Sequence, residues 1–177
     1  MVLRDVELGD VDAYLRMRCD PVMMGELGGP LPREGMADKV ARDVADAADG
    51  RAMIKMIVPD ADVPDVVAGS VTMWTHPAAD HRTAIAEIGW MVLPEFQGRG
   101  IGKRAVRQLL ELGRGDERYT SVHAFPGVGN APSNGICRSL GFRFVAEEEF
   151  VFAGRPLRTH HWVFYQPLVR PSVPPSG

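Results

Sequence analysis

The sequence predicts a mixed α/β fold, in which a mostly antiparallel central sheet of six or seven strands is flanked by about four helices. Three observations lead to this prediction. The apolar pattern changes from helical spacing to β-rich runs at Arg51, three such runs follow one another through short turns, and a helix joins the third run to a later strand. Because a helical crossover usually links parallel strands, the sheet should be antiparallel first and parallel or splayed beyond this helix.

The N-terminal part of the chain predicts one strand and two helices. Residues 2–7 alternate apolar with charged side chains, and Asp10 can cap a helix over 11–18. A cluster of three glycines and two prolines over 25–32 marks a loop. The segment 34–49 then repeats apolar residues four apart, which predicts an amphipathic helix.

The rest of the chain predicts a meander, a crossover and a hairpin. The meander strands cover 52–58, 66–74 and 83–93, and Pro94 ends the last of them because a proline restricts the preceding residue to extended geometry. A single domain over 1–166 is completed by a helix over 101–112, a strand over 119–125, a short helix over 132–139 and hairpin strands over 142–152 and 157–165. The Pro-rich tail, 167–177, is expected to be disordered.

Composition excludes several classes of protein. With 177 residues, 45% of them hydrophobic and 24% charged, the chain has the profile of an ordinary globular domain. It has no apolar run near the roughly 18 residues that cross a bilayer, so no membrane attachment is expected. A net charge of −3 without a basic block gives no footprint for nucleic acid.

Cysteine and histidine usage bears on location and metals. Cys19 and Cys137 are too few for a disulfide framework and lack the spacing of a zinc site, so a reducing, cytoplasmic location is expected. His160 and His161 are neighbours on a predicted strand and should point to opposite faces, so they cannot jointly bind one ion. No metal is expected.

The most informative segment runs from Glu87 to Arg104, where a strand passes through a glycine-rich turn into a helix. Glycines let the backbone approach an anion closely, and the unpaired N–H groups at a helix start attract negative charge. Two familiar phosphate motifs do not fit. Gln97 stands where a Walker A motif needs glycine, and Lys103 stands where a dinucleotide fingerprint needs its third glycine.

The turn resembles the coenzyme A motif of the GNAT superfamily of N-acetyltransferases, Gln/Arg-x-x-Gly-x-Gly/Ala, with Gln97, Gly100 and Gly102 in its fixed positions. The segment from Asn130 to Phe142 resembles the family's later motif, which has an Asn, a small residue three on and Gly-Phe eleven on. The order of strands and helices along nearly the whole chain also fits. The resemblance implies a GNAT-like fold and an N-acetyltransferase that uses acetyl-CoA.

The resemblance also implies a direct attack of an amine on the thioester of acetyl-CoA, in which a carboxylate accepts the proton of the amine. Glu87 is the candidate base, and a surface or structural glutamate is the alternative interpretation. The backbone N–H of Val92 or Leu93 would stabilise the oxyanion. The residues that would bind the coenzyme by resemblance are Val92, Gln97, Gly98, Arg99, Gly100, Ile101, Gly102, Lys103 and Asn130, the last of which could instead form a turn.

One position departs from the family pattern. Many relatives use a Tyr seven residues after the motif's Asn as general acid, and here that position is Cys137. Ser133 serves as an alternative acid in some branches of the family, a role that competes with stabilising the start of a helix. Cys137 is expected to be a small buried helix residue. The catalytic candidates are therefore Glu87 and Ser133.

The expected function is transfer of the acetyl group of acetyl-CoA to a primary amine of a small molecule or a protein N-terminus. A catalytically impaired acyl-CoA-binding regulatory module is one alternative, because the Tyr is missing. A transferase for a different acyl-CoA is another, because the motif reads the pyrophosphate and not the acyl group. Acceptor specificity is expected in residues 20–49 and the final hairpin. Relatives commonly dimerise, so a homodimer is also expected.

Overall fold

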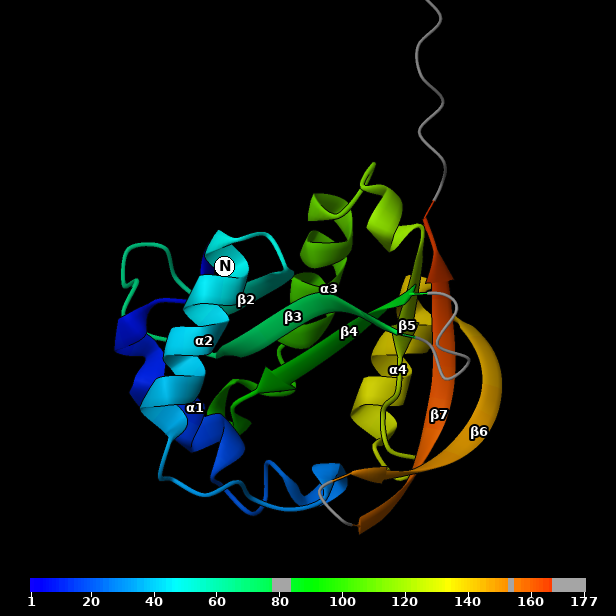
Figure 1. The fold of residues 1–177 in the computed structure, drawn as a ribbon, viewed down its shortest axis with the longest axis horizontal. Helices are drawn as coiled ribbons and strands as arrows, with labels where there is room; N and C mark the ends of the chain where they lie inside the picture. The colour runs from blue at the N-terminus through cyan, green and yellow to red at the C-terminus, as the bar shows by residue number, and fades with distance from the viewer. Residues whose placement is uncertain (78–83, 153–154, 167–177) are drawn as a thin grey trace, which may run out of the picture.

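The computed structural model describes residues 1–77, 84–152 and 155–166, and their strands form one seven-stranded sheet (Figure 1). The strand order is β1-β2-β3-β4-β5-β7-β6, and each neighbouring pair is antiparallel except β4 with β5. The predicted mixed sheet is thereby confirmed, including its parallel step after the crossover helix. The strands are β1 (Val2–Asp5), β2 (Ala52–Val58), β3 (Gly69–Pro77), β4 (Ala84–Val92), β5 (Ser121–Ala124), β6 (Arg143–Phe152) and β7 (Arg155–Tyr165). The predicted tail over 167–177 lies outside the described residues.

Helices cover both faces of the sheet (Figure 1). α1 (Val11–Arg18) and α2 (Met36–Ala48) pack on one face, and α3 (Ile101–Leu112) and α4 (Ala131–Leu140) pack on the other. Two hydrophobic cores result, because each face of the sheet is apolar at alternate positions. The first core includes Tyr14, Met17, Val40, Ile54 and Met56, and the second includes Val71, Met73, Ile88, Ala105 and Leu109. In the parts of the chain that the structure describes, no helix has the length and apolar character to cross a membrane.

The predicted role of Asp10 as the side-chain cap of α1 is wrong. Asp10 does precede α1, but its carboxylate makes no hydrogen bond to the start of that helix. The carboxylate instead accepts from the guanidinium of Arg4 at 2.6 and 2.8 Å and from the N–H of Glu7 at 2.8 Å. A buried carboxylate is stable where charged and backbone donors both reach it, and here they come from β1 and the turn that follows it.

Two strand boundaries differ from the prediction in ways that affect the site. β3 continues to Pro77, three residues past the predicted end at Trp74. β5 begins only at Ser121, because a 3-10 turn over Glu117–Tyr119 precedes it, with the side chain of Asp116 accepting from the N–H of Arg118 at its start. The extension of β3 brings one more side chain onto the face that carries Glu87.

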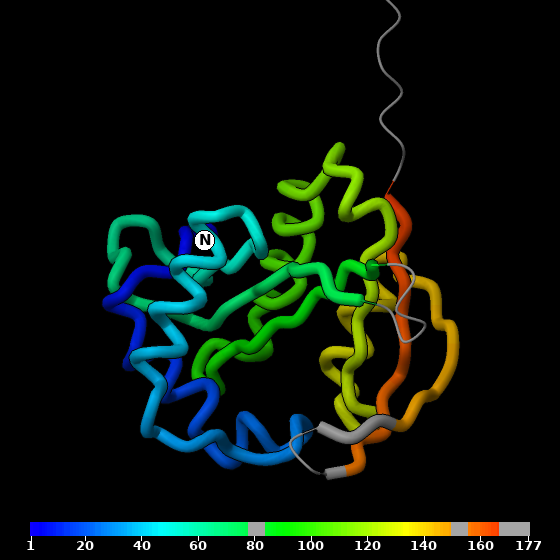
Figure 2. Tube along the Cα trace, viewed as in Figure 1, coloured from blue at the N-terminus to red at the C-terminus, as the bar shows by residue number. Residues whose placement is uncertain are grey.

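β4 and β5 separate soon after they meet. Their pairing is recorded only at Ala86 with Val122 and at Glu87 with His123. Beyond Glu87, β4 stays paired with β3 as far as Val92, whereas β5 stays paired with β7. The two chain traces therefore diverge from this point, as Figure 2 shows.

Gly69 is a glycine that the pairing of β3 with β4 requires. An added Cβ would lie 2.0 Å from the carbonyl oxygen of Met91, which belongs to backbone and cannot rotate away. We expect Gly69→Ala to lower the free energy of unfolding by about 3 kcal/mol, at the upper end of overpacking costs, as measured by urea denaturation. Gly135→Ala in α4 is the matched control, because no atom lies within 4 Å of its added Cβ. Equal losses in both variants would contradict this account.

Candidate active site

A large cleft enters the molecule where β4 and β5 separate. Its volume is about 1140 Å³, above the roughly 300–1,000 Å³ of pockets for one small ligand. Residues of both hydrophobic cores line it, so the cleft connects the two faces of the sheet through the gap. The glycine-rich turn lines one end, and Glu87 with charged side chains of α1 and α2 lines the other.

The glycine-rich turn has the backbone of an anion site. Gly98 and Gly100 have φ angles of 73° and 69°, in the left-handed region that favours glycine. A Cβ on either residue would meet no atom within 4 Å. At the start of α3 the N–H of Arg104 donates to the carbonyl of Gly100 at 3.1 Å, so the three preceding N–H groups have no acceptor within the helix. Those groups and the helix dipole can bind a pyrophosphate.

Close packing places this turn against β4 and α4. An added Cβ on Gly102 would lie 3.1 Å from Cδ1 of Ile136 and 3.3 Å from Cγ2 of Val92, so a larger residue would push α3 away. Arg99 does not line the cleft, and its guanidinium lies over the ring of Phe96 at 5.8 Å. The structure brings the other predicted coenzyme residues together along the cleft: Val92, Gln97, Gly98, Gly100, Ile101, Gly102, Lys103 and Asn130.

Two hydrogen bonds orient the backbone at the end of β4. The side-chain amide of Gln97 donates to the carbonyl of Val92 at 2.8 Å, and the N–H of Leu93 donates to the carbonyl of Ala68 at 2.8 Å. The Leu93 N–H is thus already used. Because hydrogen-bonded and non-hydrogen-bonded pairs alternate in an antiparallel ladder, the N–H of Val92 points away from β3, toward the gap that β5 has left.

The start of α4 forms the opposite wall of the cleft. The side-chain oxygen of Asn130 accepts from the N–H of Ser133 at 3.1 Å, so Asn130 caps the helix, and both residues line the cleft. The buried amide of Asn134 donates to the carbonyls of Gly127 and Asn130 at 2.9 and 2.8 Å and accepts from the indole of Trp162 at 2.9 Å. Asn134 thereby holds the loop before α4 in place.

Cys137 cannot act in the cleft. Its side chain is fully buried in the core between α3, α4 and the sheet, and it does not line the cleft. Burial raises the pKa of the Cys137 thiol to about 12. The expectation of a small buried helix residue is confirmed, and the departure from the family's Tyr leaves no acid at that position.

Glu87 is paired with His76, a residue that the sequence did not single out. Trp74 and Glu87 are register partners in β3 and β4, so the alternation of β3 puts His76 on the face of Glu87. Nε2 of His76 lies 2.9 Å from Oε2 of Glu87, and Nδ1 lies 3.0 Å from the carbonyl oxygen of Pro77. Burial raises the pKa of Glu87, and the hydrogen bond from His76 partly offsets the rise. The signal that could have found His76 is its alternation with Trp74 in a longer strand.

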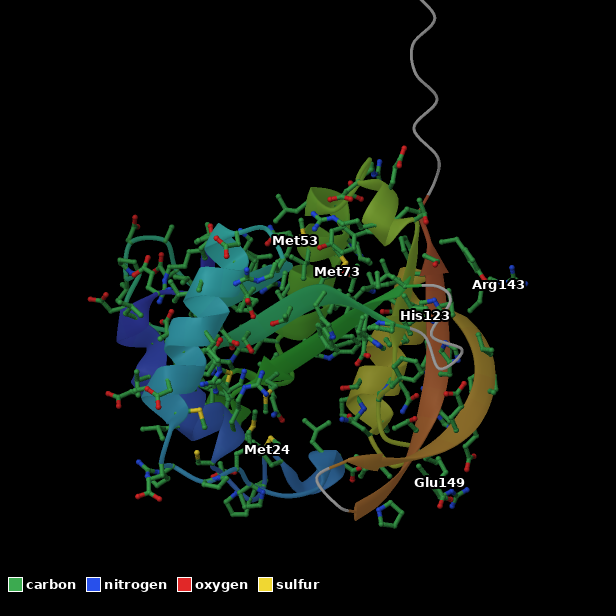
Figure 3. The ribbon with its side chains drawn as sticks, viewed as in Figure 1. Met24, Met53, Met73, His123, Arg143 and Glu149 are labelled. Atoms are coloured by element: carbon green, nitrogen blue, oxygen red, sulfur yellow. The ribbon has the colours of Figure 1, made fainter. Side chains whose placement is uncertain are left out.

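Further titratable groups lie beside Glu87 on the same face. His123 is the register partner of Glu87, and Figure 3 shows it on β5 close to β7. Nδ1 of His123 lies 2.8 Å from Nε2 of His161. The other ring nitrogen of His161, Nδ1, lies 2.7 Å from a carboxylate oxygen of Glu148. The His161 ring stacks on Phe125, which lines the cleft, with centroids 4.6 Å apart. Burial lowers the pKa of His123, and the neighbouring imidazoles of His161 and His76 lower it further.

His160 points to the other side of β7. Its Nδ1 lies 2.8 Å from the side-chain oxygen of Asn134, under α4. His160 and His161 therefore face opposite sides of the sheet, as their positions predicted. Among residues 1–77, 84–152 and 155–166, no group of three or more His, Cys, Asp or Glu side chains is arranged to hold a metal ion.

The end of the cleft beyond Glu87 is bordered by charged residues. Asp43 accepts from the hydroxyl of Tyr14 at 2.8 Å and from Lys39 at 2.9 Å. Figure 2 shows the segment between α1 and α2 along the bottom of the view. This segment brings Glu26, which lines the cleft, to the loop before α4, where an added Cβ on Gly127 would lie 2.7 Å from a Glu26 carboxylate oxygen. This segment thus closes one side of the cleft.

Comparison with known proteins agrees with this architecture. A family model described as "Acetyltransferase (GNAT) domain" matches residues 1–143. Because the match covers most of the chain, the protein belongs to the GNAT acetyltransferases. As a member of this family it is an acyltransferase.

Solved structures share the fold. A ribosomal-protein-alanine N-acetyltransferase from Brucella melitensis is 21% identical with a TM-score of 0.74, over 93% of this chain and 99% of that one. A spermidine N-acetyltransferase SpeG chimera from Vibrio cholerae and hSSAT is 21% identical with a TM-score of 0.71, over 93% and 95%. The Microcin C7 self immunity acetyltransferase MccE, solved with acetyl-CoA and AMP, is 18% identical with a TM-score of 0.74, over 92% and 91%. At these identities the likeness shows the fold alone.

The raised pKa of Glu87 predicts that Glu87→Gln stabilises the folded chain near neutral pH. Between the unfolded pKa of about 4.3 and the raised folded value, the folded state binds more protons, so stability falls as pH rises through this window. Glutamine does not ionise, so the variant does not lose this stability as pH rises. The thermal midpoint of the variant should therefore exceed that of wild type at neutral pH, and the difference should shrink as pH falls below the unfolded pKa.

Glu95→Gln is the control for this measurement. A backbone hydrogen bond and a side-chain hydrogen bond from Arg16 lower the pKa of Glu95, so its replacement should give no gain at neutral pH. A gain from Glu87→Gln that is the same at every pH, or a loss at neutral pH, would show that ionisation of Glu87 is not the cause.

Proposed function

We propose that the protein moves the acetyl group of acetyl-CoA directly to a primary amine, either on a small molecule or at a protein N-terminus, without an acyl-enzyme intermediate. The observation that carries the proposal is the continuous cleft, which links the glycine-rich turn on one face of the sheet to Glu87 on the other. Two substrates that enter from opposite ends would meet in the gap between β4 and β5.

The glycine-rich turn is suited to the pyrophosphate of coenzyme A. The free N–H groups at the start of α3 would donate to its oxygens, and the ammonium of Lys103 would supply countercharge. The pantetheine arm is a string of amides, which would need the backbone of β4 near Val92 and the amide of Asn130 as partners. Acetyl-CoA would supply the activated acyl group in this position.

Glu87 is proposed as the base. An amine with a pKa near 10 must lose a proton before it attacks, and a carboxylate whose pKa is raised by burial is a better acceptor than an exposed one. As the amine nitrogen bonds to the thioester carbon, charge develops on the carbonyl oxygen. The N–H of Val92, which points into the gap, would stabilise that oxyanion.

Ser133 is proposed to assist the leaving group. Ser133 lines the cleft, whereas Cys137 is buried away from it. A thiol with a pKa of about 8.5 leaves readily as thiolate, so a weak donor such as a serine hydroxyl is sufficient. This division of roles explains how the chemistry proceeds without the Tyr that many relatives use.

For the acceptor we propose only a chemical class, a primary amine. Among solved structures of the same fold, one protein is named for protein alanine and another for spermidine, and both acceptors present a primary amine. Glu26 and Glu87 border the acceptor end of the cleft and suit a cationic amine. A cytoplasmic location and a homodimer, both expected from the sequence, stay predictions.

The test combines calorimetry with an assay of thiol release. Wild type and Glu87→Gln should both bind acetyl-CoA with micromolar affinity, roughly 8 kcal/mol, and Gly100→Glu should not bind, because a carboxylate would occupy the anion site in a strained backbone. With spermidine or an alanine-initiated tripeptide as probe, Glu87→Gln should release thiol about 10²- to 10⁴-fold more slowly than wild type.

The outcomes separate the competing functions. Binding without turnover in wild type would favour the impaired acyl-CoA-binding module, and faster turnover with a longer acyl-CoA would favour the alternative transferase. Equal binding by wild type and Gly100→Glu would overturn the assignment of the turn. A Gly135→Ala control, which changes a glycine of α4 without a contact within 4 Å, should bind like wild type.

A further inference from the structure

His76 connects the proposed base to the outside of the cleft. The side chain of Glu87 borders the cleft and is 25% exposed, whereas His76 does not line the cleft and is 37% exposed. A single hydrogen bond of 2.9 Å joins them. The pair therefore spans the wall between the reaction space and solvent.

The hydrogen bonds of His76 determine where its protons lie. The carbonyl oxygen of Pro77 can only accept, so Nδ1 of His76 carries a hydrogen. Nε2 then either donates to an ionised Glu87 or accepts from a protonated Glu87. In both cases the pair shares one proton. The contact therefore allows a proton to pass between Glu87 and His76.

The neighbouring histidines are less suited to this task. Among the described residues, the titratable groups near Glu87 besides His76 are His123 from β5, His161 from β7 and, behind it, Glu148 from β6. From α1 and α2, Arg18, Lys39 and Asp43 line the same cleft, and Asp43 is already bonded to Lys39 and Tyr14. The carboxylate of Glu148 accepts from Nδ1 of His161, so Nε2 of His161 accepts in turn from Nδ1 of His123. Both nitrogens of His161 are occupied, and stacking on Phe125 restricts its ring.

We propose that His76 carries the proton that Glu87 takes from the acceptor amine out of the cleft, a role that rests on the proposed function. Glu87 accepts the proton from the amine, and its O–H donates to Nε2 of His76. The proton moves to Nε2 and gives an imidazolium, which then loses one proton to water or buffer, and exchange with water restores the form that carries hydrogen on Nδ1 and a free lone pair on Nε2. One proton enters and one leaves in each cycle, so Glu87 returns to its ionised form. His76 is a positioning residue, because it contacts Glu87 and not the substrates.

The test compares His76→Ala with wild type in the full chain, with acetyl-CoA and spermidine or an alanine-initiated tripeptide as probes. We expect kcat to fall about tenfold, less than the 10²- to 10⁴-fold cost of losing a base, with acetyl-CoA affinity unchanged by calorimetry. Added imidazole should restore the rate, because it can accept the proton in place of the missing ring. The acid limb of the pH profile should move to higher pH, because the hydrogen bond that lowers the pKa of Glu87 is lost.

Two histidine variants complete the design. His160→Asn lies on the opposite face of β7 and keeps a donor for Asn134, so it should show neither a slow rate nor an imidazole effect. His161→Asn keeps a donor for Glu148 and removes the acceptor for His123. If added imidazole restored the rate of His161→Asn and not that of His76→Ala, the proposal would be overturned, because the proton would then leave through His161.

The remaining outcomes are equally decisive. A slow His76→Ala enzyme that imidazole does not restore would overturn the relay and leave His76 a structural tie, and an unchanged rate would overturn it as well. Failure of the proposed function has a different signature. In that case wild type itself would bind acetyl-CoA and acetylate neither probe.

Discussion

The separation of β4 from β5 is the constraint on which the rest of the site depends. A sheet has no interior space while its strands remain paired, and here the pairing stops at Glu87. The gap exposes backbone groups of β4 that would otherwise be used in the ladder, and an exposed polar backbone group needs another partner. A substrate rich in amides can supply such partners, so the break in the sheet is itself a reason for a binding site at this position.

The two ends of the cleft have different chemistry because different elements border them. At one end, glycines and a helix start present N–H groups without side chains in the way, which suits a large anion. At the other, β3 and β4 hold a carboxylate and an imidazole within hydrogen-bonding distance. The sheet holds these ends in fixed relation because β3 and β4 remain paired without a recorded shift of register. The pairing runs from Gly69 with Val92 to Pro77 with Ala84.

The sequence could predict the features that are local. Helix periodicity, the turn around Gly100 and the order of strands depend on neighbours along the chain, and the structure agrees with them. His76 could not be found in this way, because its role depends on cross-strand register and on a strand that runs past its predicted end. Arg99 had the right charge, but only the packed structure shows its guanidinium over Phe96 and outside the cleft. Asp10 was misread because Arg4 competes for its carboxylate.

A crystal structure of the full chain with acetyl-CoA is the most direct measurement on the central claim. The account predicts the pyrophosphate at the N–H groups that begin α3, the pantetheine in the gap between β4 and β5, and the acetyl group on the side of Glu87. A coenzyme bound outside the gap, or one whose acetyl group lies away from Glu87, would contradict it.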